Sequence, residues 1–232
     1  MKNFAIAINI RPEIYLKDPA STNLGKKILS QSIYLIDSLG FEDFNFKKLA
    51  QKIASTESSV YRYFENKHYL FIYLSNWYWE WTSNRLEIAL INIEDPDLKI
   101  KQIIKTVIRT SFLNTATPFI DEEVLHRIMI REGAKAYHHK SVDNENEEGF
   151  FLSYKDLCEK ISHVFKEYNP DYKYPKSLAS TFIDACNSNI YFAKHLPRLT
   201  EITFDGDQNK MKNELFDMMY DLITNNLNAN KK

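Results

Sequence analysis

Side chains able to form hydrogen bonds are concentrated in residues 56–67, which read Thr-Glu-Ser-Ser-Val-Tyr-Arg-Tyr-Phe-Glu-Asn-Lys. If a helix follows the first threonine, its 3.6-residue period places Val60 and Phe64 on the inner side. Ser58 and Arg62 then point almost directly outward. The outer face carries hydroxyls, a guanidinium and phenols, which can bond to base edges and phosphates. This pattern indicates a helix that enters a groove of DNA.

Each outward side chain suggests its own contact. Arg62 could bind a guanine edge through two hydrogen bonds, and the small Ser58 and Ser59 would let the backbone approach the groove closely. Lys67 would add positive charge at a helix N-terminus, which already attracts phosphate. Glu57 would repel phosphate but could accept from a cytosine amino group. The ordinary alternative is a capped helical pair whose charged side chains are simply solvated.

Local signals define the helices that hold this face. A helix is predicted over 24–39, capped by Thr22 or Asn23 and ended by a left-handed residue at Gly40. Its predicted buried stripe consists of Ile28, Ser32, Leu35, Ile36 and Leu39. A second helix starts after Asn45 and is predicted to bury Phe46, Leu49, Ala50 and Ile53. The third follows Thr56, whose hydroxyl can cap the amides of Ser58 or Ser59.

The segment from Leu24 to Leu70 resembles the TetR family of bacterial repressors without gaps over about 47 residues. The matching motifs are Gly40-Phe41, Phe46-Lys-Lys-Leu-Ala50 and Thr56-x-x-Ser-Val-Tyr-Arg-Tyr-Phe-x-Asn-Lys-x-x-Leu70. The resemblance implies phosphate contacts at Tyr61 and Lys67, and base and backbone contacts at Glu57, Ser58, Ser59, Arg62 and Tyr63. The full set of candidate DNA-binding residues is Lys26, Lys47, Thr56, Glu57, Ser58, Ser59, Tyr61, Arg62, Tyr63 and Lys67.

The sequence departs from the family pattern at three positions. Ala54 stands where the turn usually has glycine, and Ser55 follows where an apolar residue is usual. Alanine can adopt the turn at some strain. Glu57 replaces the common lysine or glutamine after the cap, which bears on DNA specificity.

The rest of the chain is predicted to be helical, with no internal repeat. Helices are expected at 67–90, 97–114, 121–136, 148–168, 176–195 and 208–228, separated by proline, glycine and asparagine breakers. The acidic, asparagine-rich stretch from Ser141 to Glu148 is predicted to be a solvated loop. Residues 4–16 have an extended pattern, and either a short strand or an arm along the body is consistent with it. The fold class is therefore all-α.

The resemblance also implies a division of the chain. Residues 1–21 would form an N-terminal arm, 22–70 the DNA-binding domain, and 71–232 an effector-binding and dimerisation domain. Dimerisation would use the last two long helices, at 176–195 and 208–228. The final helix has an apolar stripe of Met211, Leu215, Met218, Met219, Leu222 and Ile223, which could equally pack in its own core.

Four aromatic residues, Trp77, Tyr78, Trp79 and Trp81, lie within five positions of the helix at 67–90. Four such side chains cannot all point into one core, so some should line a cavity or an interface. Trp77 and Trp81 are one turn apart and should share a face. The candidate effector-pocket residues are Trp77, Tyr78, Trp81 and His126. Core packing is the alternative role for each of them.

Other classes of site find no support in the sequence. The adjacent His138 and His139 would diverge on a helix, and His126 with Glu122 fits an ordinary solvated helix face. No catalytic triad, phosphate-binding glycine loop or metal-ligand spacing is present, so neither an enzyme nor a cofactor is predicted. Two cysteines form no disulfide framework, and no apolar run is long enough to span a bilayer. A cytoplasmic protein without a membrane partner is expected.

The charge distribution agrees with a nucleic-acid partner. Residues 1–76 carry ten basic and seven acidic side chains, a net +3, whereas residues 77–232 carry a net −4. The sequence thus predicts a dimeric transcriptional regulator, a repressor that binds double-stranded operator DNA and an unknown small-molecule effector. The alternatives are an all-helical ligand-binding protein or enzyme with a degenerate head, and a regulator that needs no ligand.

Overall fold

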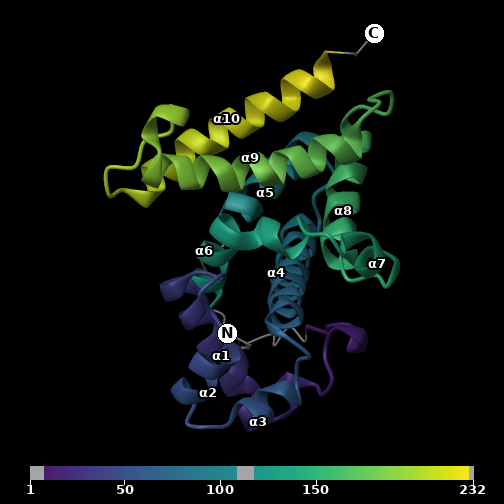
Figure 1. Cartoon of the computed structure of the whole chain (residues 1–232). Coiled ribbons are helices and arrows are strands. Elements are labelled where there is room, and N and C mark those ends of the chain that lie inside the picture. The colour runs from purple at the N-terminus through teal and green to yellow at the C-terminus, as the bar shows by residue number, and fades with distance from the viewer. Residues whose placement is uncertain (1–7, 109–117, 230–232) are drawn as a thin grey trace. The chain divides into compact units, whose positions relative to one another are not determined.

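The computed structural model describes residues 8–108 and 118–229, and no strand occurs within them (Figure 1). The α-helices are α1 (Asn23–Leu39), α2 (Phe46–Lys52), α3 (Glu57–Tyr61), α4 (Lys67–Leu90), α5 (Pro96–Ile108), α6 (Glu122–Glu132), α7 (Val142–Glu147), α8 (Leu152–Tyr168), α9 (Pro175–His195) and α10 (Gln208–Asn228). Short 3₁₀ turns are η1 (Pro12–Ile14), η2 (Pro19–Ser21), η3 (Gly133–Ala136) and η4 (Pro197–Leu199). The predicted all-α class is confirmed. Residues 109–114 of the helix expected at 97–114, and the first seven residues of the arm, lie outside the described residues.

Packing divides the chain into two compact units. The first comprises Met1–Trp81 and Ser111–Ser153, and the second comprises Thr82–Thr110 and Tyr154–Lys232. The first half of α4, together with α6 and α7, therefore packs in one unit with the candidate DNA-binding helices. The functional boundary at residue 70 remains a prediction, and we call residues 22–70 the head.

Each helix of the head begins at a side chain that accepts a hydrogen bond from a first-turn amide. The caps are Thr22 for α1, Asn45 for α2, Thr56 for α3 and Asn66 for α4. Such a cap contributes about 1 kcal/mol to stability. The predicted starts of the first three helices are therefore confirmed, and the cap of α4 is added.

The head core is made of the inner faces of these helices. Its fully buried members include Ile28, Leu29, Ile33, Ile36, Leu49, Val60 and Phe64. The predicted stripe is wrong at Leu39, which is 39% exposed at the last position of α1. Leu35 and Ile53 are only partly buried. Because η2, α2 and α6 all contact α1, its buried surface is broader than one stripe and takes in Leu29 and Ile33.

Two turns of the head have positive φ. Gly40 ends α1 at φ 80° and ψ 160°, so its backbone is not in the left-handed helical conformation expected there. Ala54 adopts φ 51° in the turn between α2 and α3. Ser55 N donates to Ala50 O at 2.9 Å and closes this turn. The strain expected from alanine at the usual glycine position is thus present.

The described part of the N-terminal arm forms turns rather than a strand. Ile14 is fully buried, and Leu16 N donates to Tyr63 O at 2.8 Å. Pro19 lies so close to α1 that a Cβ on Gly25 would come within 2.2 Å of the Pro19 carbonyl oxygen. Of the two possibilities left by the sequence, the arm is the one observed.

The stretch predicted as a solvated loop contains α7, and Glu145 within it is only 7% exposed. Glu145 is buried because of tertiary contacts, since its carboxylate lies against His68 of α4 and against His139. The next helix begins at Leu152, later than expected, because α7 and the positive-φ Gly149 intervene.

In the second unit, α5, α9 and α10 pack on one another, and α9 and α10 lie side by side (Figure 1). On α10 the residues Met211, Leu215, Met219 and Ile223 are buried, whereas Met218 and Leu222 remain partly exposed. Most of the predicted stripe therefore belongs to the unit's own core. Cys158 and Cys186 are free and buried, and burial raises the pKa of the Cys158 thiol to about 11. Among the described helices, none has the length and apolar character to cross a membrane.

Candidate nucleic-acid interface

The short helix α3 presents a polar surface that begins at the Thr56 hydroxyl. Thr56 Oγ1 accepts from Ser59 N at 3.3 Å and lies 2.9 Å from both Ser58 Oγ and Ser59 Oγ. Glu57 and Ser58 are exposed, and so is Arg62, the residue that follows α3. The three hydroxyls are therefore held together at the helix N-terminus, where backbone amides also point outward.

Tyr61 is the exposed phenol of this surface. Its ring packs edge-on against Phe46 of α2, with centroids 5.0 Å apart, yet 48% of the residue remains exposed. Lys47 on α2 is also exposed. Lys26 on α1 is partly buried, and its Nζ lies 5.6 Å from the centre of the Phe119 ring. These residues stay available as candidate DNA contacts.

Tyr63 is the exception among the candidates. It is 4% exposed, and its hydroxyl lies 2.8 Å from Thr22 Oγ1 in the residue that caps α1. A DNA contact by Tyr63 therefore stays a prediction, and in this conformation the residue is buried against the cap of α1. Because α3 ends at Tyr61, the helical period that turns Ser58 and Arg62 outward does not extend to Tyr63.

Lys67 has a role inside the head. Its Nζ donates to Phe41 O at 3.0 Å and to Glu42 O at 2.8 Å, and it lies 4.8 Å from the centre of the Phe41 ring. The ammonium thus joins the turn after α1 to the first residue of α4. An ammonium has three donors, so a phosphate contact by Lys67 would share the group with these two carbonyls.

A second set of basic residues, absent from the sequence-based candidates, lies on α6. Arg131 Nη2 donates to Ile36 O at 3.0 Å and to Asp37 O at 2.9 Å, at the end of α1. Arg127 Nη2 donates to the Asp37 carboxylate at 2.8 Å, and this pairing raises the pKa of Arg127. The four-residue spacing of Arg127, Arg131 and Lys135 could have suggested a shared face, but not its partner.

Lys135 extends this charged contact to the turn after α1. Its Nζ lies 3.0 Å from Glu42 Oε1 and 2.9 Å from Glu132 Oε2. The hydrogen bond from Lys135 holds the pKa of the Glu42 carboxyl below its ordinary value. The end of α1 is thus connected to α6 by a network of hydrogen bonds and ion pairs.

The four clustered aromatic residues of α4 are all buried. Trp77 and Trp81 are 2% and 1% exposed, and their rings stack with centroids 6.3 Å apart, so the predicted shared face is confirmed. Tyr78 and Trp79 are also buried. The expectation that some must line a cavity or interface assumed one core face, whereas α4 is buried on several sides.

The Tyr78 hydroxyl lies 2.9 Å from His126 Nδ1, and both residues are buried. Glu122 is buried as well, so the prediction of a solvated face for His126 and Glu122 is wrong. Packing of α6 within the first unit causes this burial. The sequence offered no signal for the distant partner of His126.

A pocket of about 400 Å³ lies between α5 and α10 in the second unit. It is lined by Lys101, Lys105, Ile108, Asn209, Lys212, Asn213 and Phe216. None of the four predicted effector-pocket residues lines it. Effector contacts by Trp77, Tyr78, Trp81 and His126 therefore stay a prediction, and the three lysines are a feature that the sequence did not single out.

No protein-family model and no curated protein sequence matches the chain. Solved structures do match it. AibR in complex with isovaleryl coenzyme A and operator DNA superposes with a TM-score of 0.58 at 13% identity, covering 84% of this chain and 98% of AibR. The fatty acid degradation regulator FadR from Bacillus halodurans gives a TM-score of 0.60 at 11% identity, covering 88% and 95%.

A putative TetR-family regulator from Syntrophomonas wolfei superposes with a TM-score of 0.61 at 13% identity, covering 86% of this chain and 94% of that one. At sequence identities this low, the superpositions show a shared fold and do not show a shared binding site. The chain has the fold of the TetR-family transcriptional regulators, and the resemblance drawn from the head sequence is confirmed at that level.

Proposed function

We propose that the protein is a sequence-specific DNA-binding transcriptional regulator, a repressor that leaves its operator when a small molecule binds. It would act as a homodimer in the cytoplasm and without enzymatic chemistry. The observation that carries the proposal is the exposed polar surface of α3, held by capped helices in a TetR-type fold. AibR, which shares this fold, has been solved with operator DNA.

The exposed residues divide into two kinds of DNA contact. Arg62 is the base-reading candidate, because a guanidinium can bond twice to a guanine edge. Tyr61 and Lys47 are phosphate candidates, which position the head without reading sequence. The Thr56 and Ser58 hydroxyls stand between them at the α3 N-terminus.

The test begins with selection of duplexes from a random-sequence pool by the purified full-length chain, followed by fluorescence anisotropy. Arg62→Ala should reduce preference at one position per half-site by about 1–3 kcal/mol. Arg198→Ala is the matched control, since it removes the same charge from an exposed residue of η4. Failure to enrich any sequence would contradict sequence-specific binding, and equal effects of both variants would exclude Arg62 as the residue that reads a base.

Dimerisation is proposed through α9 and α10, where Met218 and Leu222 are the partly exposed members of an otherwise buried apolar stripe. Met218→Glu and Leu222→Glu should shift the mass measured by light scattering toward a monomer and weaken operator binding. Asp217→Lys, at an exposed position of the same helix, is a control for charge alone. A monomeric unmodified chain that still binds a palindromic operator would exclude this arrangement.

The effector proposal rests on the lysine-lined pocket between α5 and α10. Lys101 also pairs with Asp97 at 2.7 Å, and the remaining positive charge of Lys105 and Lys212 favours an anionic ligand. The AibR structure holds isovaleryl coenzyme A, whose phosphates are anionic. Isovaleryl coenzyme A should raise the melting temperature of the chain, and Lys105→Ala should reduce that shift. By linkage, operator and effector should weaken each other's binding by one common factor of about 5–150. Equal effector affinity with and without operator would leave DNA binding intact but exclude release by this ligand.

A further inference from the structure

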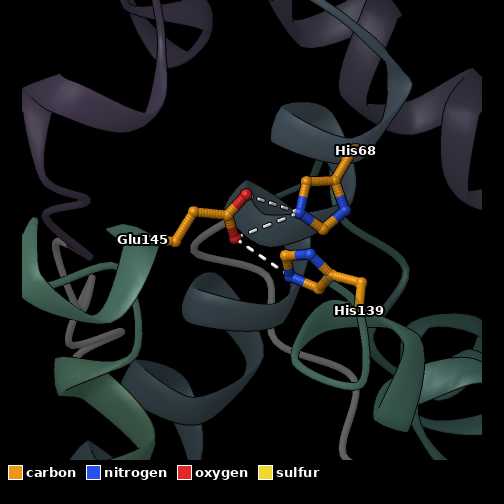
Figure 2. A group of neighbouring side chains, drawn as sticks. All are labelled: His68, His139 and Glu145. Atoms are coloured by element: carbon orange, nitrogen blue, oxygen red, sulfur yellow. Dashed lines mark hydrogen bonds and ion pairs between the residues drawn. The ribbon is translucent and has the colours of Figure 1, made fainter. Parts of the chain in front are cut away.

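Two histidines and a buried glutamate converge in the first unit, although 77 positions separate His68 from Glu145 (Figure 2). His68 lies in the first turn of α4, His139 follows η3, and Glu145 lies on α7. His68 Nε2 is 3.1 Å from both carboxylate oxygens of Glu145, and His139 Nε2 is 3.1 Å from Oε2. One ligand-type atom from each residue lies within 4.8 Å of the others.

The orientation of His139 distinguishes this cluster from a plain pair of hydrogen bonds. Although its Nε2 lies 3.1 Å from the carboxylate, it is buried and lacks a hydrogen bond of acceptable geometry. Side chains that share a metal ion aim at a common point and not at each other. Ligands about 2.0–2.2 Å from a tetrahedral Zn²⁺ would lie roughly 3.3 Å apart, close to the 3.1 Å between each imidazole Nε2 and the Glu145 carboxylate.

Packing fixes the carboxylate in place. Glu145 O accepts from Phe150 N at 2.9 Å, and the fully buried Phe150 in turn offers its carbonyl to Asn76 Nδ2 at 2.8 Å. A carboxylate that is 93% buried against two imidazoles is stabilised further by a cation. Neutral imidazoles alone would leave its charge largely uncompensated.

We propose that His68, His139 and Glu145 form a binding site for a divalent transition-metal ion, with Zn²⁺ as the best match. Two imidazoles and one carboxylate are a ligand set that zinc uses in proteins. The fourth coordination position would be taken by water or by an anionic donor. The ion would fasten α7 and the segment around His139 to the first turn of α4.

Metal binding has a defined consequence for His139. Without metal, Ser141 N donates to His139 Nδ1 at 3.3 Å, which leaves the imidazole proton on Nε2. Coordination through Nε2 moves that proton to Nδ1, so the Ser141 amide loses its acceptor. The Ser141 amide resonance is therefore a local reporter of the bound ion.

The site also bears on the proposed function, and this step rests on it. His68 follows Lys67, whose ammonium holds the turn after α1. An ion on His68 would stiffen the start of α4, which is part of the head, so operator affinity should change with metal. Metal binding itself is measured without DNA, which keeps the two proposals separable.

The experiment uses the full-length chain after treatment with a chelator, titrated with ZnCl₂ in competition with a chromophoric indicator. One Zn²⁺ per chain is expected. Zn²⁺ binding should weaken by at least about 100-fold in each of the variants His68→Gln, His139→Gln and Glu145→Gln. Even residues that only hydrogen-bond to metal ligands change metal affinity by about 10–100-fold. His138→Gln is the matched control, since His138 is adjacent but exposed and outside the cluster.

Titration with CoCl₂ supplies a second measurement on the unmodified chain. Bound Co²⁺ should give visible d–d absorption without a thiolate charge-transfer band, and Zn²⁺ should shift the Ser141 amide resonance. Helical content by circular dichroism verifies that each variant is folded. Absence of stoichiometric binding to the unmodified chain, or unchanged affinity in folded Glu145→Gln and His139→Gln variants, would overturn the proposal and leave an ordinary buried ion pair.

Discussion

Within the first unit, the head is joined to the helices that follow it at two places built from different interactions. The end of α1 meets α6 through charged groups, among which the Arg127 and Arg131 side chains are 44% and 36% exposed. The beginning of α4 meets α7 and Phe150 through buried groups, with Asn76 only 6% exposed. We refer to these as the charged contact and the buried contact.

The two contacts should differ in strength and in response to conditions. Solvent-exposed ion pairs contribute about 0–1 kcal/mol each and weaken with salt. A buried hydrogen bond leaves desolvated groups when it is broken, and a buried aromatic ring leaves a cavity. The contacts between α1 and α6 should therefore break with little loss of stability, whereas the contacts between α4 and α7 should persist.

The largest effect is expected at the buried contact. Phe150→Ala should lower the free energy of unfolding by about 3–5 kcal/mol, because a fully buried ring is replaced by a cavity. The measurement is urea denaturation followed by circular dichroism. Leu152→Ala, at a residue that is 37% exposed, should have a much smaller effect and serves as the control. Similar losses for both would mean that α7 is not held by Phe150.

Asn76 tests the polar part of the same contact. Its Nδ2 donates to Ile72 O at 2.9 Å and to Phe150 O at 2.8 Å. Asn76→Ala should lower stability by about 1–3 kcal/mol, since the Phe150 carbonyl loses a buried donor. Asn144→Ala, at an exposed position of α7, should change stability little. A loss that disappears in high salt would argue against a buried hydrogen bond.

Mutation of the charged contact should lower stability less than mutation of the buried contact, and this loss should depend on salt. Arg131→Ala removes two hydrogen bonds to the last carbonyls of α1 and should lower stability by about 1 kcal/mol. Arg131→Lys keeps the charge but loses the forked donor, so it should recover only part of this loss. Repeating both denaturation curves at about 1 M NaCl should shrink the difference between the unmodified chain and Arg131→Ala. A difference in stability that stays the same at high salt would mean that Arg131 acts through buried interactions, as in the buried contact.

The smallest effect concerns Glu42 and depends on pH. Lys135 lowers the folded-state pKa of Glu42, so the pair stabilises the fold above the ordinary carboxyl pKa and is lost as pH falls through the lowered value. Glu42→Gln should therefore be slightly less stable than the unmodified chain at pH 7, and this difference should disappear as pH falls through the lowered pKa of Glu42. Asp43→Asn is the control, since it removes a carboxylate charge from the exposed neighbouring residue. A Glu42→Gln deficit that persists at low pH would contradict the assignment.

The sequence predicted the head well because its signals are local. Thr22, Asn45 and Thr56 each cap a helix within three residues of the amide they serve. The long helices also ended close to their predicted borders, since proline and glycine interrupt a helix at their own positions. These features require no knowledge of distant partners.

The sequence predicted less where a residue depends on a distant segment. Tyr63 is buried with its hydroxyl 2.8 Å from that of Thr22, which lies 41 positions earlier. Glu145 is buried in a helix because His68, 77 positions earlier, lies against its carboxylate. An acidic, asparagine-rich stretch has no periodicity that could reveal such a partner. The charged residues of α6 were missed for the same reason.

The docking of the arm has a consequence for the order of folding during translation. Leu16 bonds to Tyr63, and Tyr15 packs against Tyr73, so the arm cannot reach its final position until the start of α4 has been synthesised. Gly25 and Pro19, by contrast, can meet as soon as α1 has formed. On the ribosome the first-made segment would thus be among the last parts of the head to settle, and it would close over helices already in place.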